Sequence, residues 1–303
     1  MPARKTTLGH RRRAIIGDQR STDVARMAQK TFWNAYDHLG GCVLLNLLWT
    51  LLSLPWLALA LILAALGWSQ MVAGHVLFAL MLAGSGLLQA LLSPVSAALW
   101  AVTARWCDYQ PVPVKAFFPA LRRYFGRALA MWLIFSAAAF LLSLNAYFYG
   151  TWLDAVPFLG ALVSGLMIWA YLAVILTGMY ALPLLAQGDL SIRRVVRESF
   201  LLVLDNPLYS LVLALIAGLV AMLGLISGAG FFFLAVSLTA VITNTGLREL
   251  LRSYRATEER PGEKDRPRTW KEVYAQQDRA QQETEEETRS WRDLWKPWED
   301  HGR

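Results

Sequence analysis

The sequence predicts an all-α membrane protein, a polytopic bundle of about six transmembrane helices with amphipathic helices at its cytoplasmic face. Of its 303 residues, 56% are hydrophobic and only 17% are charged, whereas a soluble domain needs charge on roughly a quarter of its residues. The charges are also clustered, because Asp154 is the only one between Ala128 and Ala186. That stretch far exceeds the roughly 20 apolar residues with which a helix crosses the hydrocarbon core.

Composition divides the chain into three parts: a basic cytoplasmic N-terminal segment (1–39), a six-helix transmembrane domain (40–252) and a charged cytoplasmic tail (253–303). The first apolar run is too long for the core of a cleavable signal peptide, so we expect a retained membrane helix. In the first part, apolar residues recur at helical spacing and predict an amphipathic lead-in helix. They are Val24, Met27, Ala28, Phe32, Ala35, Tyr36 and Leu39.

Apolar segments predict the membrane spans. They cover residues 41–66, 71–106, 127–149, 157–186, 207–228 and 230–252. The second contains Ser93-Pro94, which predicts a kink or break, because proline lacks the N–H that a helix interior uses. Its remainder, from Trp100 to Trp106, is expected to leave the membrane at the inner face.

Two inner loops predict amphipathic surface helices, at 114–125 and 190–203, each followed directly by a span. Such helices lie in the interface, with the apolar side toward lipid and the basic side toward anionic headgroups. The apolar positions are Val114, Phe117, Phe118, Leu121 and Phe125 in the first, and Leu190, Ile192, Val195, Val196, Phe200 and Val203 in the second. The basic positions are Lys115, Arg122 and Arg123, and Arg193, Arg194 and Arg197.

Orientation follows from lysine and arginine, which membrane insertion retains in cytoplasmic loops. Eight of them precede residue 40, five lie in 105–127, three in 187–206 and thirteen in 248–303, which accounts for all 29. The alternate loops near 67–70, 150–156 and 228–229 contain none. This bias predicts a multi-pass protein of the cell membrane with both termini in the cytoplasm. It also explains the formal charge of +7, so no nucleic-acid partner is expected.

The charged tail carries its own signals. Thr269 with Glu272 matches a capping box, and a solvated helix is expected from about 270 to 290. Tryptophans then cluster at helical spacing around 291–298. This cluster either docks a partner protein or lies on the inner membrane surface.

The sequence predicts no catalytic, cofactor-binding or metal site. It contains no phosphate loop and no HExxH, GxSxG or CxxC motif, and Cys42 and Cys107 are interpreted as packing residues. Gly224 and Gly228 form a GxxxG pattern, interpreted as close packing within one chain in preference to a dimer contact. Neutral polar residues in the spans are interpreted as interhelical hydrogen-bonding positions in preference to a substrate site. They are Asn46, Gln89, Asn145, Thr243, Asn244 and Thr245.

Several segments occur in an order that resembles a known family. They are Asn46–Pro55 (NLLWTLLSLP), Ser93–Trp100 (SPVSAALW), Phe117–Phe125 (FFPALRRYF), Leu182-Pro-Leu-Leu and Asp205-Asn-Pro207. This order is similar to that of the YesL-like family of bacterial integral membrane proteins, over roughly residues 25 to 250. It departs from the family pattern where 38 residues separate Pro55 from Pro94, an extension of the second span. The family implies no established activity, although some members are associated with carbohydrate-utilisation loci and sugar importers.

Three functions compete. The first is a non-enzymatic accessory or scaffold component of a membrane assembly, linked to carbohydrate uptake, with a transport protein as partner; this is the one we expect. The second is a transporter or channel for a neutral solute, with Asn46, Gln89, Asn145 and Asn244 converging on one cavity. The third is an enzyme acting on lipid, which would have to gather Asp37, His38, Asp108 and Asp154, the last of them on the opposite side of the membrane.

Overall fold

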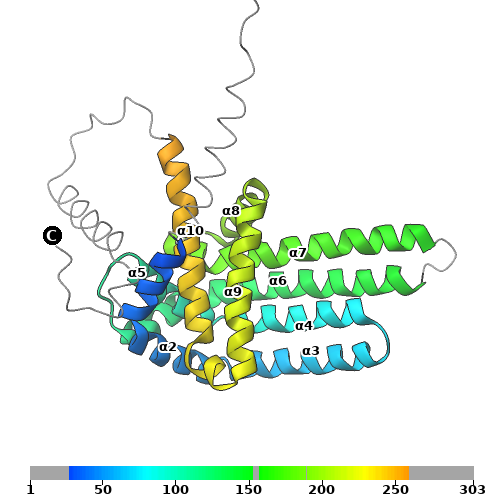
Figure 1. The fold of residues 1–303 in the computed structure, drawn as a ribbon, viewed down its shortest axis with the longest axis horizontal. Coiled ribbons are helices and arrows are strands. Elements are labelled where there is room, and N and C mark those ends of the chain that lie inside the picture. Colours follow the sequence, from blue (N-terminus) through cyan, green and yellow to red (C-terminus); the bar gives the residue numbers. More distant parts are fainter. Residues whose placement is uncertain (1–26, 153–156, 189, 259–303) are drawn as a thin grey trace, which may run out of the picture. The chain divides into compact units, whose positions relative to one another are not determined.

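The computed structural model describes residues 27–152, 157–188 and 190–258, and this part of the chain is helical, with no strand (Figure 1). The predicted all-α fold class is therefore confirmed. The chain divides into two compact units, the first comprising Met1–Asp37 with Arg248–Arg303 and the second His38–Leu247. The basic leader before residue 27, the predicted tail helix and the tryptophan cluster lie outside the described residues.

The second unit begins with two helices where the sequence predicts one span. Helix α2 (Leu39–Leu52) ends at Ser53, and α3 (Leu54–Val72) begins with Pro55 in its first turn. Proline has no N–H for the carbonyl four residues earlier, so the helix breaks before it. Of the two, α3 has the length to cross a membrane, with 19 residues. The shorter α2 contributes buried side chains, among them Asn46 and Trp49.

Helices α3 and α4 (Val76–Leu91) pack as a hairpin, joined at Gly74, whose φ of +90° favours glycine. Two further glycines bring the backbones together. A Cβ on Gly67 would lie 3.0 Å from the Ala79 carbonyl oxygen, and one on Gly86 would lie 2.9 Å from that of Ala60. The rest of α3 is exposed or half-buried, with only 6% of its apolar window buried, as expected for a helix that faces lipid.

The second predicted span breaks at Ser93-Pro94, as expected. Helix α5 (Ser96–Cys107) follows the proline, and it makes a 65° bend with α4. Every residue of α5 except Arg105 is buried. The segment from Trp100 to Trp106 lies in the core of the second unit, where α5 packs on α2, α6 and α7. Its expected exit from the membrane at the inner face stays a prediction.

Helix α6 (Phe117–Trp152) unites a predicted surface helix with a predicted span. A short 3-10 turn, η1 (Val114–Ala116), leads into one continuous helix of 36 residues, so the separate helix expected at 114–125 does not form. At 1.5 Å per residue α6 is about 54 Å long. The hydrocarbon core is roughly 30 Å thick, so part of α6 extends beyond it. Helix α7 (Pro157–Gly188) packs along α6 (Figure 1).

Helix α8 (Ile192–Asp205) forms at the second predicted surface helix, but its faces are used differently. Val195, Ser199 and Val203, four residues apart, are buried against the unit. The opposite face carries three exposed arginines in its first half, at 193, 194 and 197, and exposed Phe200, Leu201 and Leu204 in its second half. The basic and apolar surfaces are thus separated along the axis. Of the apolar side predicted to face lipid, Val195 and Val203 pack on protein instead, whereas Phe200 is exposed.

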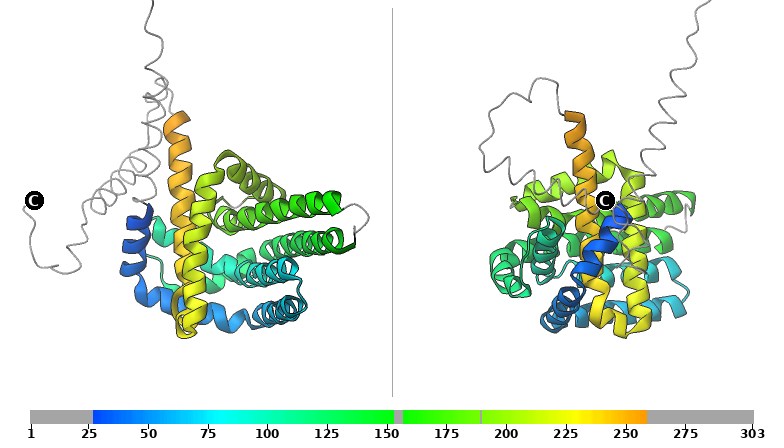
Figure 2. Two further views of the ribbon diagram at one scale, coloured as in Figure 1. Left: turned by 45° about the vertical axis from the view of Figure 1, so that its right-hand side comes forward. Right: turned by 60° about the vertical axis from the view of Figure 1, so that its left-hand side comes forward.

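Helix α9 (Pro207–Ser227) runs beside the part of α10 (Val236–Glu258) that belongs to the second unit, where Gly246 lies against Leu213 (Figure 1). A turn at Gly228 (φ +62°) and the π-helical segment η2 (Phe231–Ala235) join the two helices. A Cβ on Gly224 would overlap that of Ala235, so the predicted close packing of this glycine within one chain is confirmed. In both further views α9 and the first half of α10 cross the direction of α3, α4, α6 and α7 (Figure 2).

The first unit is described at two segments. Residues 27–37 are helical, as the lead-in pattern predicts, and the second segment is the end of α10 from Arg248. They are joined by an ion pair in which Lys30 Nζ lies 3.2 Å from Glu249 Oε1, with the side chains 8% and 10% exposed. Lys30, which the sequence analysis counts among the cytoplasmic basic residues, is therefore buried, and its charge is paired with that of Glu249.

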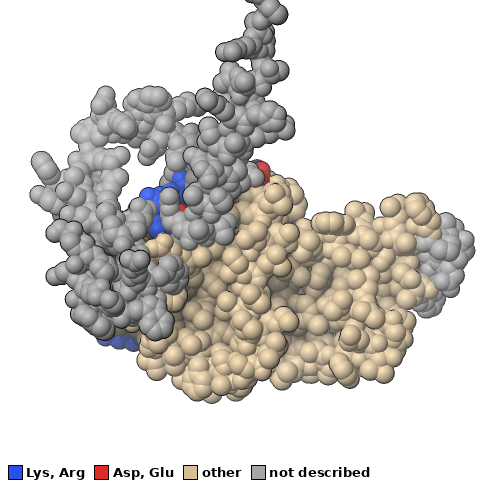
Figure 3. Space-filling model, viewed as in Figure 1, with Lys and Arg blue, Asp and Glu red and all other residues tan. Residues whose placement is uncertain are grey.

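The surface of the second unit shows where charge is excluded. Over the outer halves of α3, α4, α6 and α7, the face drawn in Figure 3 carries no charged side chain. Large apolar residues are exposed on these helices, including Leu61 and Trp68 on α3 and Leu166 on α7, at 70%, 70% and 63%. In water such a surface would drive aggregation, whereas in a bilayer it contacts acyl chains.

Candidate functional site

Buried polar side chains gather where the chain breaks, at the α2–α3 junction and at the α4–α5 bend. The Trp49 indole donates to Ser96 Oγ at 2.8 Å, Ser96 Oγ lies 2.9 Å from Ser93 Oγ, and Ser93 Oγ lies 3.2 Å from Ser53 Oγ. All four side chains are fully buried. Helix breaks expose backbone groups that lipid cannot satisfy, and this polar cluster fixes the two breaks against each other.

A second group of bonds joins α5 to α7 and α10. The Trp100 indole donates to Thr243 Oγ1 at 2.9 Å. The Asn244 amide donates to the Trp100 carbonyl at 3.1 Å and to Thr103 Oγ1 at 2.9 Å, and its oxygen accepts from Gln187 Nε2 at 3.1 Å. Three helices that are distant in sequence therefore meet at one buried amide.

Asn46 performs the same role for η2. Its amide donates to the carbonyls of Phe231 and Phe232 at 2.7 and 2.8 Å, and its oxygen accepts from the N–H groups of Val236 and Ser237, each at 3.0 Å. An amide side chain has two donor hydrogens and two acceptor lone pairs, so Asn46 is fully satisfied. The wider turns of a π-helix leave backbone groups without their usual partners, and α2 supplies the replacements.

The remaining predicted amides lie elsewhere. Gln89 Oε1 accepts from Ser136 Oγ at 2.8 Å, which links α4 to α6. Asn145 Nδ2 donates to the Leu141 carbonyl of its own helix at 2.7 Å. The predicted interhelical role is therefore confirmed for Asn46, Gln89 and Asn244 and is wrong for Asn145. The convergence of all four on one cavity, which the neutral-solute hypothesis requires, is contradicted.

Sequence reasoning missed two tyrosines in the middle of α7. Tyr171 donates to the Met81 carbonyl at 2.7 Å and lies 3.1 Å from Ser85 Oγ, while Tyr180 lies 3.1 Å from Ser210 Oγ. Both are buried. Their position could have indicated a buried hydrogen-bonding role, since tyrosine prefers the membrane interface and these two lie inside a predicted span.

Of the titratable residues considered for enzyme chemistry, Asp37, His38 and Asp108 belong to the described part of the chain and Asp154 does not. His38 stacks on Trp106, with ring centroids 4.7 Å apart, and Asp154 lies in the gap at 153–156. Among the described residues, no three His, Cys, Asp or Glu side chains are grouped as a metal would need. Cys42 is buried, and Cys107 Sγ lies 3.5 Å from Thr245 Oγ1, as expected for packing residues.

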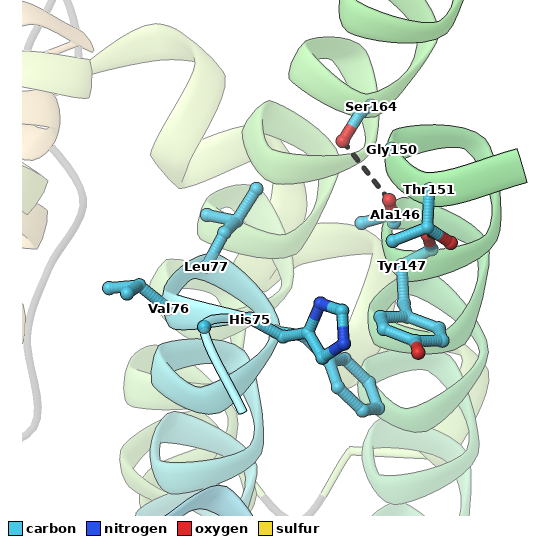
Figure 4. Close-up of a pocket in the computed structure, with 10 residues that line it drawn as sticks. His75, Val76, Leu77, Ala146, Tyr147, Gly150, Thr151 and Ser164 are labelled. Carbon is cyan, nitrogen blue, oxygen red and sulfur yellow. Dashed lines mark hydrogen bonds between the residues drawn. The ribbon is translucent and has the colours of Figure 1, made fainter. Parts of the chain in front are cut away.

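A cavity of about 260 Å³ lies between the α3–α4 turn, the end of α6 and the start of α7 (Figure 4). The His75 and Tyr147 rings point toward each other there, 5.0 Å apart. The hydroxyls of Thr151 and Ser164 donate to carbonyls of α6, at 2.8 and 3.1 Å. Of the lining side chains, the His75 imidazole and the Tyr147 phenol are those left to meet a polar ligand.

Comparison of the chain with protein-family models, with curated proteins and with solved structures found no match. The class of protein therefore follows from the structure itself. Five helices are long and apolar enough to cross a membrane, or six if the bent pair α4–α5 is one span, among the described residues. Together with the exposed apolar surface, they define an all-α multi-pass membrane protein.

Proposed function

We propose that this protein resides in the cell membrane with both termini in the cytoplasm and acts there as a non-enzymatic accessory or scaffold component of a membrane assembly. One observation carries the proposal. The buried amides Asn46 and Asn244 and the hydroxyls around α5 are bonded to other helices. A transport path or an active site needs polar groups that meet a ligand, whereas these groups hold helices together.

The orientation rests on the arrangement of basic residues. The exposed arginines of α8 and of the first turns of α6 belong to the loops that the positive-inside bias assigns to the cytoplasm. Helix α6 is longer than the hydrocarbon core is thick, so part of it extends beyond the core. Arg122 and Arg123 lie in its charged first turns. Anionic lipid at the inner face would be attracted to both sets.

The kind of assembly follows from the resemblance to the YesL-like family. Its members' association with sugar importers makes an importer of carbohydrate the first partner to test. The tail supplies a second reason, because its cluster of Trp291, Trp295 and Trp298 has the side chain most favoured at protein interfaces.

Affinity purification of the full chain in mild detergent, followed by mass spectrometry, tests the scaffold role. We expect a second membrane protein to copurify at a fixed ratio. A full-length variant with Trp291, Trp295 and Trp298 changed to alanine is the matched control for the tail. Loss of the partner in this variant assigns docking to the cluster, and retention assigns the cluster to the membrane surface. A chain that is reproducibly alone in the purified sample contradicts the scaffold role.

The transporter alternative receives less support, since its four amides are bonded at separate contacts. A flux assay in liposomes separates the two functions. We expect vesicles that contain the purified chain to release a trapped neutral sugar no faster than protein-free vesicles do. Specific, saturable release would favour the transporter.

A further inference from the structure

An apolar cleft lies where α9 crosses α7. Its walls come from α4, α5, α7, α9 and α10, all within the second unit, and its volume is about 150 Å³. Helices that cross at a large angle touch over a short length and diverge on either side of the contact. The cleft lies beside the crossing of α7 and α9, whose different directions are seen in Figure 2. Small residues widen it, since Gly178 and Gly218 line the two facing helices.

The polar atoms along this cleft are occupied by the protein. The Trp100 indole donates to Thr243 Oγ1, and the hydroxyls of Thr239 and Thr243 donate to the carbonyls four residues earlier, of Ala235 and Thr239, at 2.8 and 2.9 Å. The rest of the wall is leucine, isoleucine, methionine, alanine and glycine. A water or sugar would find no partner there, and apolar cavities of this kind stay dry. The occupant that fits is therefore a hydrocarbon.

The cleft opens toward the surface that faces lipid. Leu87 on its wall is 45% exposed, and on the neighbouring turns of α9 Leu219 and Met222 are 58% and 60% exposed. Acyl chains are the hydrocarbon at such a surface. An unfilled gap loses the dispersion contacts that a chain would restore.

Charge near the cleft favours an acidic lipid. Helix α8 contacts both α7 and α9, and its exposed arginines are Arg193, Arg194 and Arg197. Arg194 is paired with Glu198 at 2.6 Å, so Arg193 and Arg197 contribute most of the positive charge that a headgroup would meet. The cleft begins at Leu182 on α7 and Ala214 on α9, about 10 Å along each helix from the end that adjoins α8. Each leaflet contributes roughly 15 Å of hydrocarbon, so a headgroup at α8 leaves its chain long enough to enter the cleft.

We propose that the cleft between α7 and α9 binds one acyl chain of an acidic phospholipid, whose headgroup lies against the arginines of α8. The proposal depends on membrane residence and not on the scaffold role. A chain that purifies alone would leave it intact, and lipid binding can be measured on the isolated protein.

Photo-crosslinking tests the site directly. The full chain is reconstituted in phosphatidylcholine vesicles that carry phosphatidylglycerol with a diazirine near the middle of one acyl chain, and labelled peptides are mapped by mass spectrometry. We expect label on cleft residues such as Leu88, Met179 and Ala217, as well as on the exposed face of α3. Label on α3 without label in the cleft overturns the proposal, and this result needs no variant.

Two glycine variants provide a matched comparison. A Cβ on Gly218 meets no atom within 4 Å, and the same is true of Gly165, which lies on α7 and does not line the cleft. We expect Gly218→Leu to fill the cleft and to lose the label on Leu88 and Met179 while α3 remains labelled. Gly165→Leu should keep the full pattern. Unchanged cleft labelling in Gly218→Leu overturns the assignment.

The headgroup is tested with a second probe. The same diazirine chain on phosphatidylcholine, which has no net charge, replaces the phosphatidylglycerol probe. We expect weaker cleft labelling with the neutral lipid and equal labelling of α3 with both. Equal cleft labelling by the two probes overturns the assignment to an acidic lipid.

Discussion

Single residues hold the irregular parts of this protein in place. Asn46 binds four backbone groups around η2, and Asn244 joins α5, α7 and α10. In a membrane, interhelical hydrogen bonds contribute on average about 0.6 kcal/mol each. The loss is larger when the remaining partner is buried and stays unsatisfied. Amides that satisfy several backbone groups at once should therefore dominate the stability contributed by polar residues.

Replacing Asn46 by leucine should destabilise the protein by about 2–4 kcal/mol, because two carbonyls and two N–H groups lose their partner. Thermal unfolding in detergent, followed by tryptophan fluorescence, measures the change. Asn145→Leu is the matched control, since Asn145 bonds only to the Leu141 carbonyl of its own helix. Equal destabilisation by the two variants would contradict the larger contribution that we assign to the four backbone bonds of Asn46.

The buried pair Lys30–Glu249 makes a second prediction at this scale. Removing one partner leaves an uncompensated buried charge, so Lys30→Met and Glu249→Leu should each cost about 3 kcal/mol. The double variant should recover most of that loss, because two apolar residues leave no charge behind. Unfolding of all four proteins gives the coupling free energy. Additive losses would contradict a direct interaction between the two side chains.

At the scale of elements, two glycines have different surroundings: one lies within a continuous helix with open space around it, and the other lies at a close contact between two elements. Gly126 lies in α6 between the predicted surface helix and the predicted span, and a Cβ there meets no atom within 4 Å. The sequence pattern predicted a break at this point, but α6 continues through it. Gly224 on α9 is the opposite case, because a Cβ there would overlap Ala235.

Substituting these two glycines by alanine should change the stability of the protein in opposite directions. Gly126→Ala should stabilise the protein by about 0.5–1 kcal/mol, since alanine loses less backbone entropy in a continuous helix. Gly224→Ala should destabilise it by about 1–3 kcal/mol through overpacking against η2. The temperature of unfolding in detergent measures both. Destabilisation by Gly126→Ala would instead favour a hinge between two separate helices.

At the scale of the whole molecule, composition does not determine the direction in which a helix runs. Helix α9 has a mean hydropathy of 2.5 in its apolar window, the highest of the candidate spans, yet it crosses the direction of α6 and α7 (Figure 1). The positive-inside bias assigns the turns near Ala73 and Ala229 to the outer side and those near Gln110 and Ser191 to the inner side.

Cysteine labelling tests this threading. In a variant whose two native cysteines are alanine, Ala73→Cys and Ala229→Cys should react with a membrane-impermeant maleimide in intact cells. Gln110→Cys and Ser191→Cys should react only after the cells are made permeable. All four positions are exposed. External labelling of Ala73→Cys combined with protection of Ala229→Cys would mean that the α9–α10 hairpin does not cross the bilayer.

Much of the fold could be predicted because its causes are local. Long apolar runs specify helices of membrane length, and Ser93-Pro94 specifies the break between α4 and α5, since a missing N–H acts on its own turn. The interhelical roles of Asn46 and Asn244 followed from the high free energy of an unbonded amide in lipid. Their partners did not follow, because pairing depends on which helices meet.

The sequence by itself determined the class of this protein, its helices and the asymmetry of its basic residues, all of which depend on short-range composition. Tertiary structure alone decided that α5 lies in the buried core, that Val195 and Val203 of α8 pack on protein and that Lys30 meets Glu249. An apolar or charged side chain has the same local pattern whether its neighbour is lipid, water or another helix. The neighbour is set by contacts between residues far apart in the chain, which periodicity does not encode.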